Sequence, residues 1–331
     1  MLLAYRIAGA FALGIVFSCS GSASAQTPAS GTGQGYPNKP IRIVTGDPGG
    51  GIDFTARLIA QGLPATLGQQ VVVDNRGGGG GILAGETVAK AAPDGYTLLV
   101  YSNNIWILPL LRKNVSYDPA RDFATVALVS RAPNILVVNP SVSATNVQEL
   151  IALAKAKPGE LNYAQGATGG SNHLGAELFK AMAGVNIVEV PYKGVTPAFT
   201  DLISGRVQLM FAVAASVTPH IKSGKLRALA VTSAQPSPLA PGLPTVAATG
   251  LPGYESEALF GLFAPAQTSR LLVTRLNREV VQLVTRPDMK EKFFAAGAEV
   301  IGSSPEQFAA VRTADMARWG KVIRDAGIKA D

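Results

Sequence analysis

Two glycine-rich runs, each placed directly before a stretch with helical periodicity, are the residues best suited to bind a small molecule. Backbone N–H groups at a helix start point outward with the positive end of the helix dipole, and glycines let a ligand approach them closely. The pattern predicts two anion seats that hold one small anion between facing loops. The predicted ligand-binding residues of these runs are Asp47, Pro48, Gly49, Gly50, Gly51 and Asp53 in the first, and Ala167, Thr168, Gly169, Gly170, Ser171 and His173 in the second.

Polar residues at the ends of other predicted strands add four candidates for ligand contact. Ser102 and Asn103 end the third predicted strand, and Tyr192 and Lys193 follow a later one. Loops after strand ends bind ligands in open α/β sheets, so these side chains are predicted to face the same site. Lys193 is alternatively a solvated lysine. Trp106 has two interpretations, as a residue that lines the site or as a core residue among apolar neighbours.

Side chains for catalysis or metal binding are scarce. The histidines are His173 and His220, and the single cysteine is Cys19, in a segment that we expect to be removed. His173 is expected either to face the site or to cap its helix locally. Ser171 and His173 are too close in sequence for a hydrolase triad, whose members come from separate segments. We therefore expect no catalytic residue, no metal site and no cofactor.

Nucleotides and nucleic acids are poor candidates for the ligand. The run of five glycines at 77–81 gives a loose dinucleotide fingerprint with Ala84, but such glycine runs match that pattern by chance. The formal charge is +7, yet basic residues do not cluster and aromatic residues make up only 7% of the chain. The spread positive charge can attract acidic solutes, and it does not indicate a nucleic-acid surface.

Strands and helices are predicted to alternate along the chain, which is typical of an α/β protein. β-branched and apolar runs predict strands at 41–45, 71–74, 97–101, 123–129, 134–138, 161–164, 187–190, 207–211, 226–231 and 257–263. Apolar periodicity predicts helices from Asp53 (as its capping residue), at 82–91 and 146–155, from Ser171 (as its N-cap), and at 197–204, 269–285 and 305–326.

The N-terminal segment 1–25 has the features of a secretory signal. Arg6 precedes an apolar run at 7–17, and small residues end at Ala25, where cleavage is predicted. Cleavage before Cys19, as in a lipoprotein, is the alternative. Residues 26–35 are rich in Ser, Gly and Thr and are predicted to be the flexible N-terminus of the exported mature protein.

The rest of the chain is predicted to form two lobes. Lobe I comprises residues 36–134 and 260–331, and lobe II comprises residues 135–259. Because lobe I is discontinuous, two crossings link the lobes, and we expect a hinge with a ligand cleft between them.

Sequence motifs along nearly the whole mature chain resemble one family. They are YPNKPIRI at 36–43, PGGGID at 48–53, VVVDNR at 71–76, APDGYTL at 92–98, YDPARDF at 117–123, VPYKG at 190–194 and GKLRALAVT at 224–232. They resemble the Bug family, the solute receptors of tripartite tricarboxylate transporters. The resemblance implies a type II periplasmic-binding-protein fold, a small organic acid as ligand, and the membrane components of a transporter as partner. It also implies that residues 48–53 and 166–171 grip a ligand carboxylate, partly through ordered water.

The chain departs from the family pattern at two positions near the expected ligand. The first loop begins Thr45-Gly46-Asp47 where the family has apolar residues, and Ala212 stands where an Asp is frequent. Asp47 is expected either to turn away from the cleft, with Arg76 as its partner, or to face the cleft and accept a hydrogen bond from the ligand.

The sequence predicts an exported, monomeric and non-catalytic receptor that closes on a small carboxylate-bearing solute and delivers it to a tripartite transporter. One alternative is a receptor that signals to a membrane sensor. The other is a periplasmic hydrolase or isomerase that uses the same cleft, for which the chain offers no paired acid and base.

Overall fold

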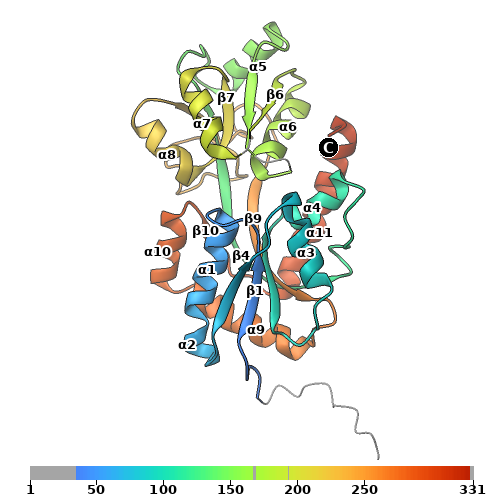
Figure 1. Cartoon of the computed structure of the whole chain (residues 1–331). Helices are drawn as coiled ribbons and strands as arrows, with labels where there is room; N and C mark the ends of the chain where they lie inside the picture. The colour runs from blue at the N-terminus through green and yellow to red at the C-terminus, as the bar shows by residue number, and fades with distance from the viewer. Residues whose placement is uncertain (1–34, 167–168, 193, 329–331) are drawn as a thin grey trace, which may run out of the picture. The chain divides into compact units, whose positions relative to one another are not determined.

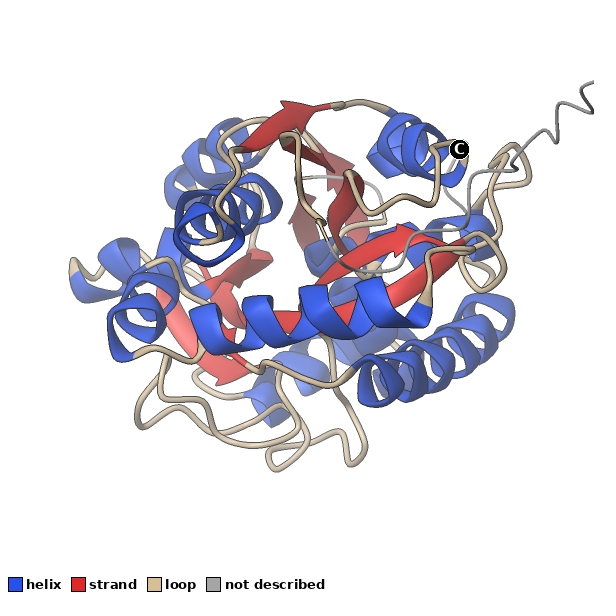
Figure 2. Cartoon of the chain, turned by 90° about the horizontal axis from the view of Figure 1, so that it is seen from below, coloured by secondary structure: helices blue, strands red, loops and turns tan. Residues whose placement is uncertain are grey.

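The computed structural model describes residues 35–166, 169–192 and 194–328 (Figure 1). The predictions for the signal segment and for residues 26–34, Ala167, Thr168 and Lys193 lie outside the described residues. Within the described part, strands and helices alternate as predicted, and helices flank the strands in Figure 2. The predicted α/β class is confirmed, with a sheet of mixed parallel and antiparallel pairing.

The elements agree closely with the predicted pattern in their order. The strands are β1 (Ile41–Thr45), β2 (Val71–Asn75), β3 (Thr97–Ser102), β4 (Phe123–Val138), β5 (Asn162–Gln165), β6 (Val188–Pro191), β7 (Leu209–Val213), β8 (Arg227–Val231), β9 (Glu257–Pro265) and β10 (Glu299–Val300). The helices are α1 (Gly51–Gly62), α2 (Pro64–Leu67), α3 (Ile82–Ala89), α4 (Asn104–Leu111), α5 (Val147–Ala156), α6 (Ser171–Ala183), α7 (Val195–Ser204), α8 (Ala214–Lys222), α9 (Arg270–Val284), α10 (Pro287–Ala295) and α11 (Pro305–Ala326), with a short 3-10 turn η1 at Gly79–Gly81.

Strand β4 is one strand of 16 residues, and it joins two sections of the sheet. Its residues up to Pro133 pair with β9, and from Asn134 onward it pairs with β7 and β8. The first section therefore has the order β2-β1-β3-β9-β4, and the second continues from β4 through β7 and β5 to β6. The prediction of two separate runs here was wrong, because Arg131 and Pro133 interrupt the apolar pattern without ending the strand.

The strand directions bring the predicted loops together. β1, β2 and β3 are parallel to one another, and β9 is antiparallel to both β3 and β4, so β1–β3 run in the same direction as β4. β7 is antiparallel to β4 and parallel to β5, which is parallel to β6. Because β4 leads from the first section into the second, the carboxyl ends of β1–β3 and of β5–β7 face each other (Figure 1).

Trp106 lies in the core. Its side chain is fully buried, its ring packs against Phe263 and Phe308, and its Nε1–H donates to Asp315 Oδ2 at 2.9 Å. Of the two interpretations of Trp106, the core one is therefore correct. The surrounding helix α4 was missed because its sequence, NIWILPLL, is apolar on every side and has no amphipathic period.

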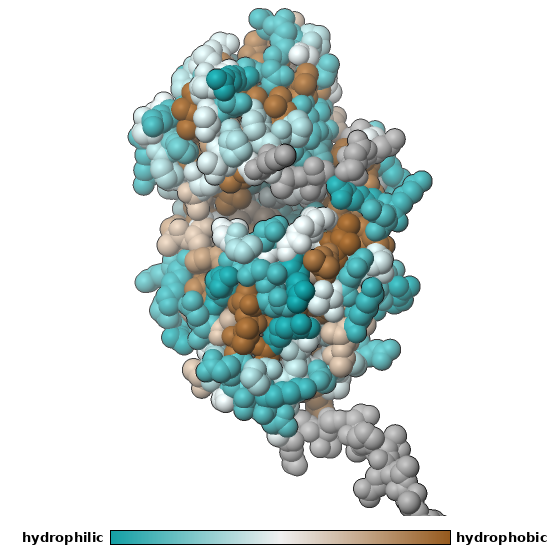
Figure 3. Space-filling view, viewed as in Figure 1, coloured by the Kyte–Doolittle hydropathy of each residue, from teal (hydrophilic) through white to brown (hydrophobic). Residues whose placement is uncertain are grey.

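Exposed large apolar side chains come from separate elements, for example Val72 of β2, Leu83 of α3, Leu271 of α9 and Phe294 of α10. On the face seen in Figure 3, small hydrophobic patches are surrounded by hydrophilic residues. Such scattered exposure is normal for globular proteins. In the described part of the chain, no helix combines the length and the apolar character that crossing a membrane requires.

A buried carboxyl group lies where the two sheet sections meet. Glu257 pairs with Pro133 across the β4–β9 ladder and is 6% exposed. Its Oε1 has no hydrogen-bond partner in the described residues, and its Oε2 lies 3.9 Å from Arg131 Nη1. Burial raises the pKa of Glu257 from 4.5 to about 7, because the attraction of Arg131 offsets only part of the desolvation.

Replacing Glu257 by glutamine is expected to stabilise the protein at pH 8 and to have little effect at pH 4. The folded pKa is raised, so the stability from this group is complete below its ordinary pKa of 4.5 and is lost as the pH rises through about 7. Glutamine mimics the protonated form, and the expected gain at pH 8 is about 3 kcal/mol. Urea unfolding at both pH values measures it, with exposed Glu306→Gln as control. A gain in the free energy of unfolding that is the same at both pH values contradicts the raised pKa of Glu257.

Candidate functional site

The first glycine loop connects β1 to α1 and is fixed by Asp53. Helix α1 begins at Gly51 with Gly50 as N-cap, so the prediction that Asp53 caps the helix was three residues late. Asp53 is instead the third helical residue, and its buried carboxylate reaches back into the loop. Its Oδ2 accepts hydrogen bonds from the Gly49 N–H at 3.0 Å and from Arg57 Nε at 2.9 Å.

A second contact ties Asp53 to β2. Its Oδ1 accepts from Asn75 Nδ2 at 2.8 Å, and the same amide donates to Gly46 O at 2.8 Å. Burial alone raises the pKa of Asp53, but the hydrogen bonds from Arg57, Asn75 and Gly49 outweigh burial and hold the pKa below its ordinary value. Asp53 is therefore an ionised support beneath the loop.

The second glycine loop connects β5 to α6 and is fixed in the same way by His173. Gly170 is the N-cap of α6, so the prediction of Ser171 as N-cap was one residue late. His173 is the third helical residue and is 2% exposed. Its Nδ1 accepts a hydrogen bond from the Gly169 N–H at 3.0 Å. Of the two expectations for His173, the local capping role is the one observed.

The two loops share one arrangement, which changes the prediction for the anion seats. In each, the third helical residue accepts the N–H of the residue before the N-cap, so the N–H groups of Gly49 and Gly169 are already bonded. The next N–H groups donate no hydrogen bond within the described part of the chain. They belong to Gly50, Gly51, Ile52 and Asp53 in the first loop, and to Gly170, Ser171, Asn172 and His173 in the second. These eight groups are the available donors.

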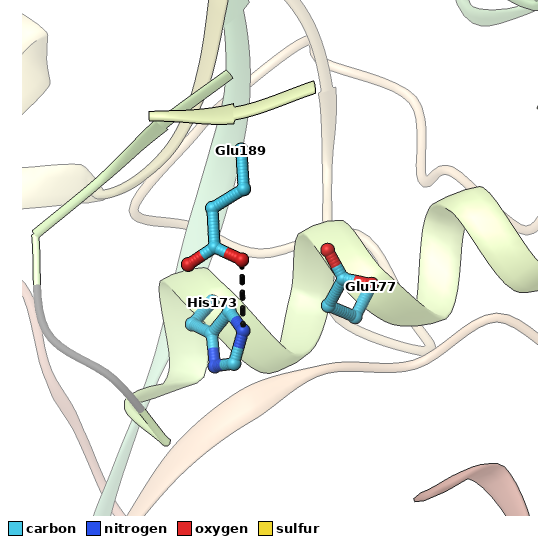
Figure 4. Close-up of side chains that lie close together, drawn as sticks. All are labelled: His173, Glu177 and Glu189. Atoms are coloured by element: carbon cyan, nitrogen blue, oxygen red, sulfur yellow. Dashed lines mark ion pairs between the residues drawn. The ribbon is translucent and has the colours of Figure 1, made fainter. Parts of the chain in front are cut away.

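His173 also lies beside two glutamates (Figure 4). Its Nε2 is 3.8 Å from Glu189 Oε2, while Glu177 Oε1 accepts from the Tyr163 hydroxyl at 2.7 Å and from Lys180 Nζ at 2.6 Å. Ligand atoms of His173, Glu177 and Glu189 lie within 4.8 Å of one another, a spacing that a metal ion can bridge.

The hydrogen bonds argue against a metal at this cluster. Because Nδ1 of His173 accepts from Gly169, neutral His173 carries its proton on Nε2, the atom that would have to bind the metal. Glu177 is already paired with Lys180. Burial lowers the pKa of His173, although Glu189 acts in the opposite direction. The arrangement fits a neutral histidine that holds a loop, and the absence of a metal site stays a prediction.

Several other predicted site residues have their polar atoms engaged within the fold. The Asn103 side chain donates to Glu257 O at 3.0 Å, and the Tyr192 hydroxyl donates to Asp201 at 2.8 Å. Ala212 is 2% exposed within β7, and Ser102 is buried at the end of β3. Pro48 is exposed in the first loop.

Asp47 is exposed, and the partner expected for it is not the one observed. Arg76 Nε instead lies 3.1 Å from both carboxylate oxygens of Asp74. The Asp47 carboxylate contacts Gly77, in the space where a side chain at position 77 would project.

Sequence reasoning missed Asn104, which connects loops from both sheet sections. Its Nδ2 donates to Gly80 O at 2.5 Å, and its Oδ1 lies 2.9 Å from the position that a Cβ on Gly169 would take. The sequence did offer a sign of Asn104, because it follows the predicted site residues Ser102 and Asn103 at a strand end. Its position at the start of α4 was known only from the structure.

Two α/β sheet sections joined by β4 and β9, with helix N-termini at the facing strand ends, define a solute-binding protein of the periplasmic binding-protein type. Residues 55–328 match the model of the tripartite tricarboxylate transporter family receptor. The chain belongs to this receptor family.

Relatives and solved structures agree with that assignment. Protein BugT of Bordetella pertussis is 38% identical over 300 residues, which cover 89% of this chain and 91% of BugT. An R. palustris protein solved with adipate is 40% identical, with a TM-score of 0.79 over 89% of this chain and 99% of that one. MatC from Rhodopseudomonas palustris, solved with bound malate, is 30% identical, with a TM-score of 0.76 over 87% of this chain and 100% of that one.

Proposed function

We propose that this receptor captures a small carboxylate-bearing solute in the periplasm and delivers it to the membrane components of a tripartite transporter. The observation that carries the proposal is the set of free N–H groups at the starts of α1 and α6, on facing strand ends. A carboxylate placed between them accepts hydrogen bonds from both helix N-termini. Adipate and malate in the related structures are molecules of this class.

The proposal also covers the oligomeric state of the receptor, its lack of catalysis, its signal cleavage and its division into lobes. The chain acts as a monomer without catalytic activity, and the signal segment is cleaved after Ala25. Lobe I comprises residues 36–134 and 260–331, and lobe II comprises residues 135–259. The change of partners along β4 at Pro133 and Asn134 supports this division, because the strand leaves one sheet section there and enters the other.

A thermal-shift screen of mono-, di- and tricarboxylates tests the proposal, with the matching amides as controls. A carboxylate at 100 times its dissociation constant adds about 2.7 kcal/mol to the apparent stability. We expect stabilisation by at least one acid and none by its amide. Equal stabilisation by acid and amide contradicts carboxylate recognition.

Replacing Gly50 by valine is expected to weaken carboxylate binding about tenfold or more without unfolding the protein. Gly50 has a φ of −91°, and no atom lies within 4 Å of the position that its Cβ would take, so a side chain fits but covers the neighbouring N–H groups. Gly169 is less suitable, because its φ is +77° and Asn104 leaves no room. Calorimetric titration measures the loss, and Ala65→Val on exposed α2 is the control. Unchanged affinity contradicts a ligand approach at Gly50.

A further inference from the structure

Three polar side chains lie around the polyglycine loop at residues 77–81. Each has at least one side-chain oxygen that makes no hydrogen bond within the described residues. The Asp47 carboxylate lies over Gly77 and makes no hydrogen bond or ion pair within the described residues. The Tyr101 hydroxyl likewise has no hydrogen bond there, although Tyr101 is only 5% exposed. Asn104 Oδ1 is buried without a partner.

The loop brings these groups to one place. The Tyr101 hydroxyl lies 2.9 Å from the Cβ position of Gly81, at the carboxyl end of β3, and 3.2 Å from that of Gly46, which follows β1. Asn104 holds Gly80 through its Nδ2. Because Gly46 directly precedes Asp47, the hydroxyl lies beside the loop that carries the carboxylate. Burial raises the pKa of Tyr101, and the charge of Asp47 raises it further.

The hydrogen-bonding capacity of these three side chains limits which ligand groups can bind among them. Asp47 and Asn104 Oδ1 can only accept hydrogen bonds, and the Tyr101 hydroxyl can accept or donate. Of the three groups, Asn104 Oδ1 is a buried atom without a partner, and such atoms are uncommon in folded proteins unless a ligand or water supplies the missing bond. The nearby arginines do not neutralise Asp47, because Arg57 is bonded to Asp53 and Arg76 to Asp74.

We propose that Asp47, Tyr101 and Asn104 form a subsite that receives a hydroxyl or ammonium group carried by the bound carboxylate. The inference rests on the proposed function and narrows its ligand class to hydroxy- and amino-carboxylates. The free N–H groups at the starts of α1 and α6 bind the carboxylate, and the subsite binds the donor beside it. A ligand with negative charge alone gains no hydrogen bond from Asp47 and is repelled by it.

Calorimetric titration with succinate, malate and aspartate, and with adipate and 2-aminoadipate, tests this selectivity. In the unmodified receptor, the hydroxy or amino acid is expected to bind at least tenfold more tightly than the plain acid of the same length. Asp47→Asn and Tyr101→Phe are each expected to reduce that ratio to about threefold or less. Gly77→Ala is expected to do the same, because the added methyl group displaces the Asp47 carboxylate.

Two matched variants control for the chemical changes. Asp94→Asn removes a carboxylate charge near the start of β3. Tyr117→Phe removes a buried, unpaired hydroxyl from a ring that packs on Gly85. Both variants should keep the full preference for the hydroxy or amino acid over the plain acid of the same length. Equal affinity for plain and substituted acids, or a preference that survives in Asp47→Asn and Tyr101→Phe, overturns the subsite and leaves the proposed function standing. Failure of every carboxylate to bind overturns the proposed function, and the subsite with it.

Discussion

Replacing Asp53 by leucine is expected to lower the free energy of unfolding by about 3 kcal/mol and to weaken ligand binding at least tenfold. The change removes an ionised acceptor that bonds Gly49, Arg57 and Asn75, and it leaves the Gly49 N–H without its partner. The loop before α1 then loses the contact that fixes its path. Thermal unfolding measures the first effect, as a fall of roughly 6–12 °C in Tm, and calorimetric titration measures the second.

Asp53→Asn is the matched control for this prediction. It keeps an acceptor and loses the charge, so both effects should be intermediate. The pH dependence gives a second check. The folded pKa of Asp53 is lowered, so its contribution is present above its ordinary pKa and is lost as the pH falls through the folded value. Normal binding by Asp53→Leu contradicts a supporting role for this residue in the seat.

The local patterns of the sequence were sufficient to predict both glycine loops. β-branched runs, glycine runs and apolar periodicity are properties of neighbouring residues, and they predicted β1, β5 and the helices that follow their loops. The prediction that the two loops face each other also rested on the expectation that the chain crosses twice between the lobes. The resemblance to a known family, which the comparisons confirm, extended these predictions to the fold and the ligand class.

What the sequence did not show depends on contacts between distant residues. The N-caps of α1 and α6 are Gly50 and Gly170, three residues and one residue before the predicted Asp53 and Ser171, because Asp and Ser are as common at N-caps as in a first helical turn. The hydrogen bonds from Asn75 to Asp53 and from Asn104 to Gly80 cross between elements. Helix periodicity carries no information about such pairs.

The two supports differ in charge, and this gives the two loops different responses to pH. Asp53 is ionised at neutral pH and holds its loop as an anion, whereas His173 holds its loop only while Nδ1 is unprotonated. A proton added to Nδ1 turns the acceptor into a donor that faces the donor of Gly169. Acidification therefore acts on the second loop by protonating His173, whose pKa burial lowers from 6.5, and on the first loop by protonating Asp53, whose pKa is lowered from 3.8.

His173→Leu is accordingly expected to lower carboxylate affinity at least tenfold at every pH, because the Gly169 N–H loses its acceptor. His173→Asn keeps an acceptor near the Nδ1 position that cannot be protonated, and it should restore most of the affinity. The folded pKa of His173 is lowered by burial, so its contribution is complete above its ordinary pKa of 6.5 and is lost as the pH falls below that value.

Calorimetric titration from pH 7.5 to pH 5 compares the three proteins. The unmodified receptor should lose affinity on acidification, and His173→Asn should lose less. His220→Asn controls for the other histidine, which lies in α8 and packs against Phe199. A role of His173 in packing alone predicts that the leucine variant binds normally and that acidification affects the asparagine variant as much as the unmodified protein. A role in holding Gly169 predicts the opposite on both counts, because only an unprotonated acceptor at that position completes the second loop.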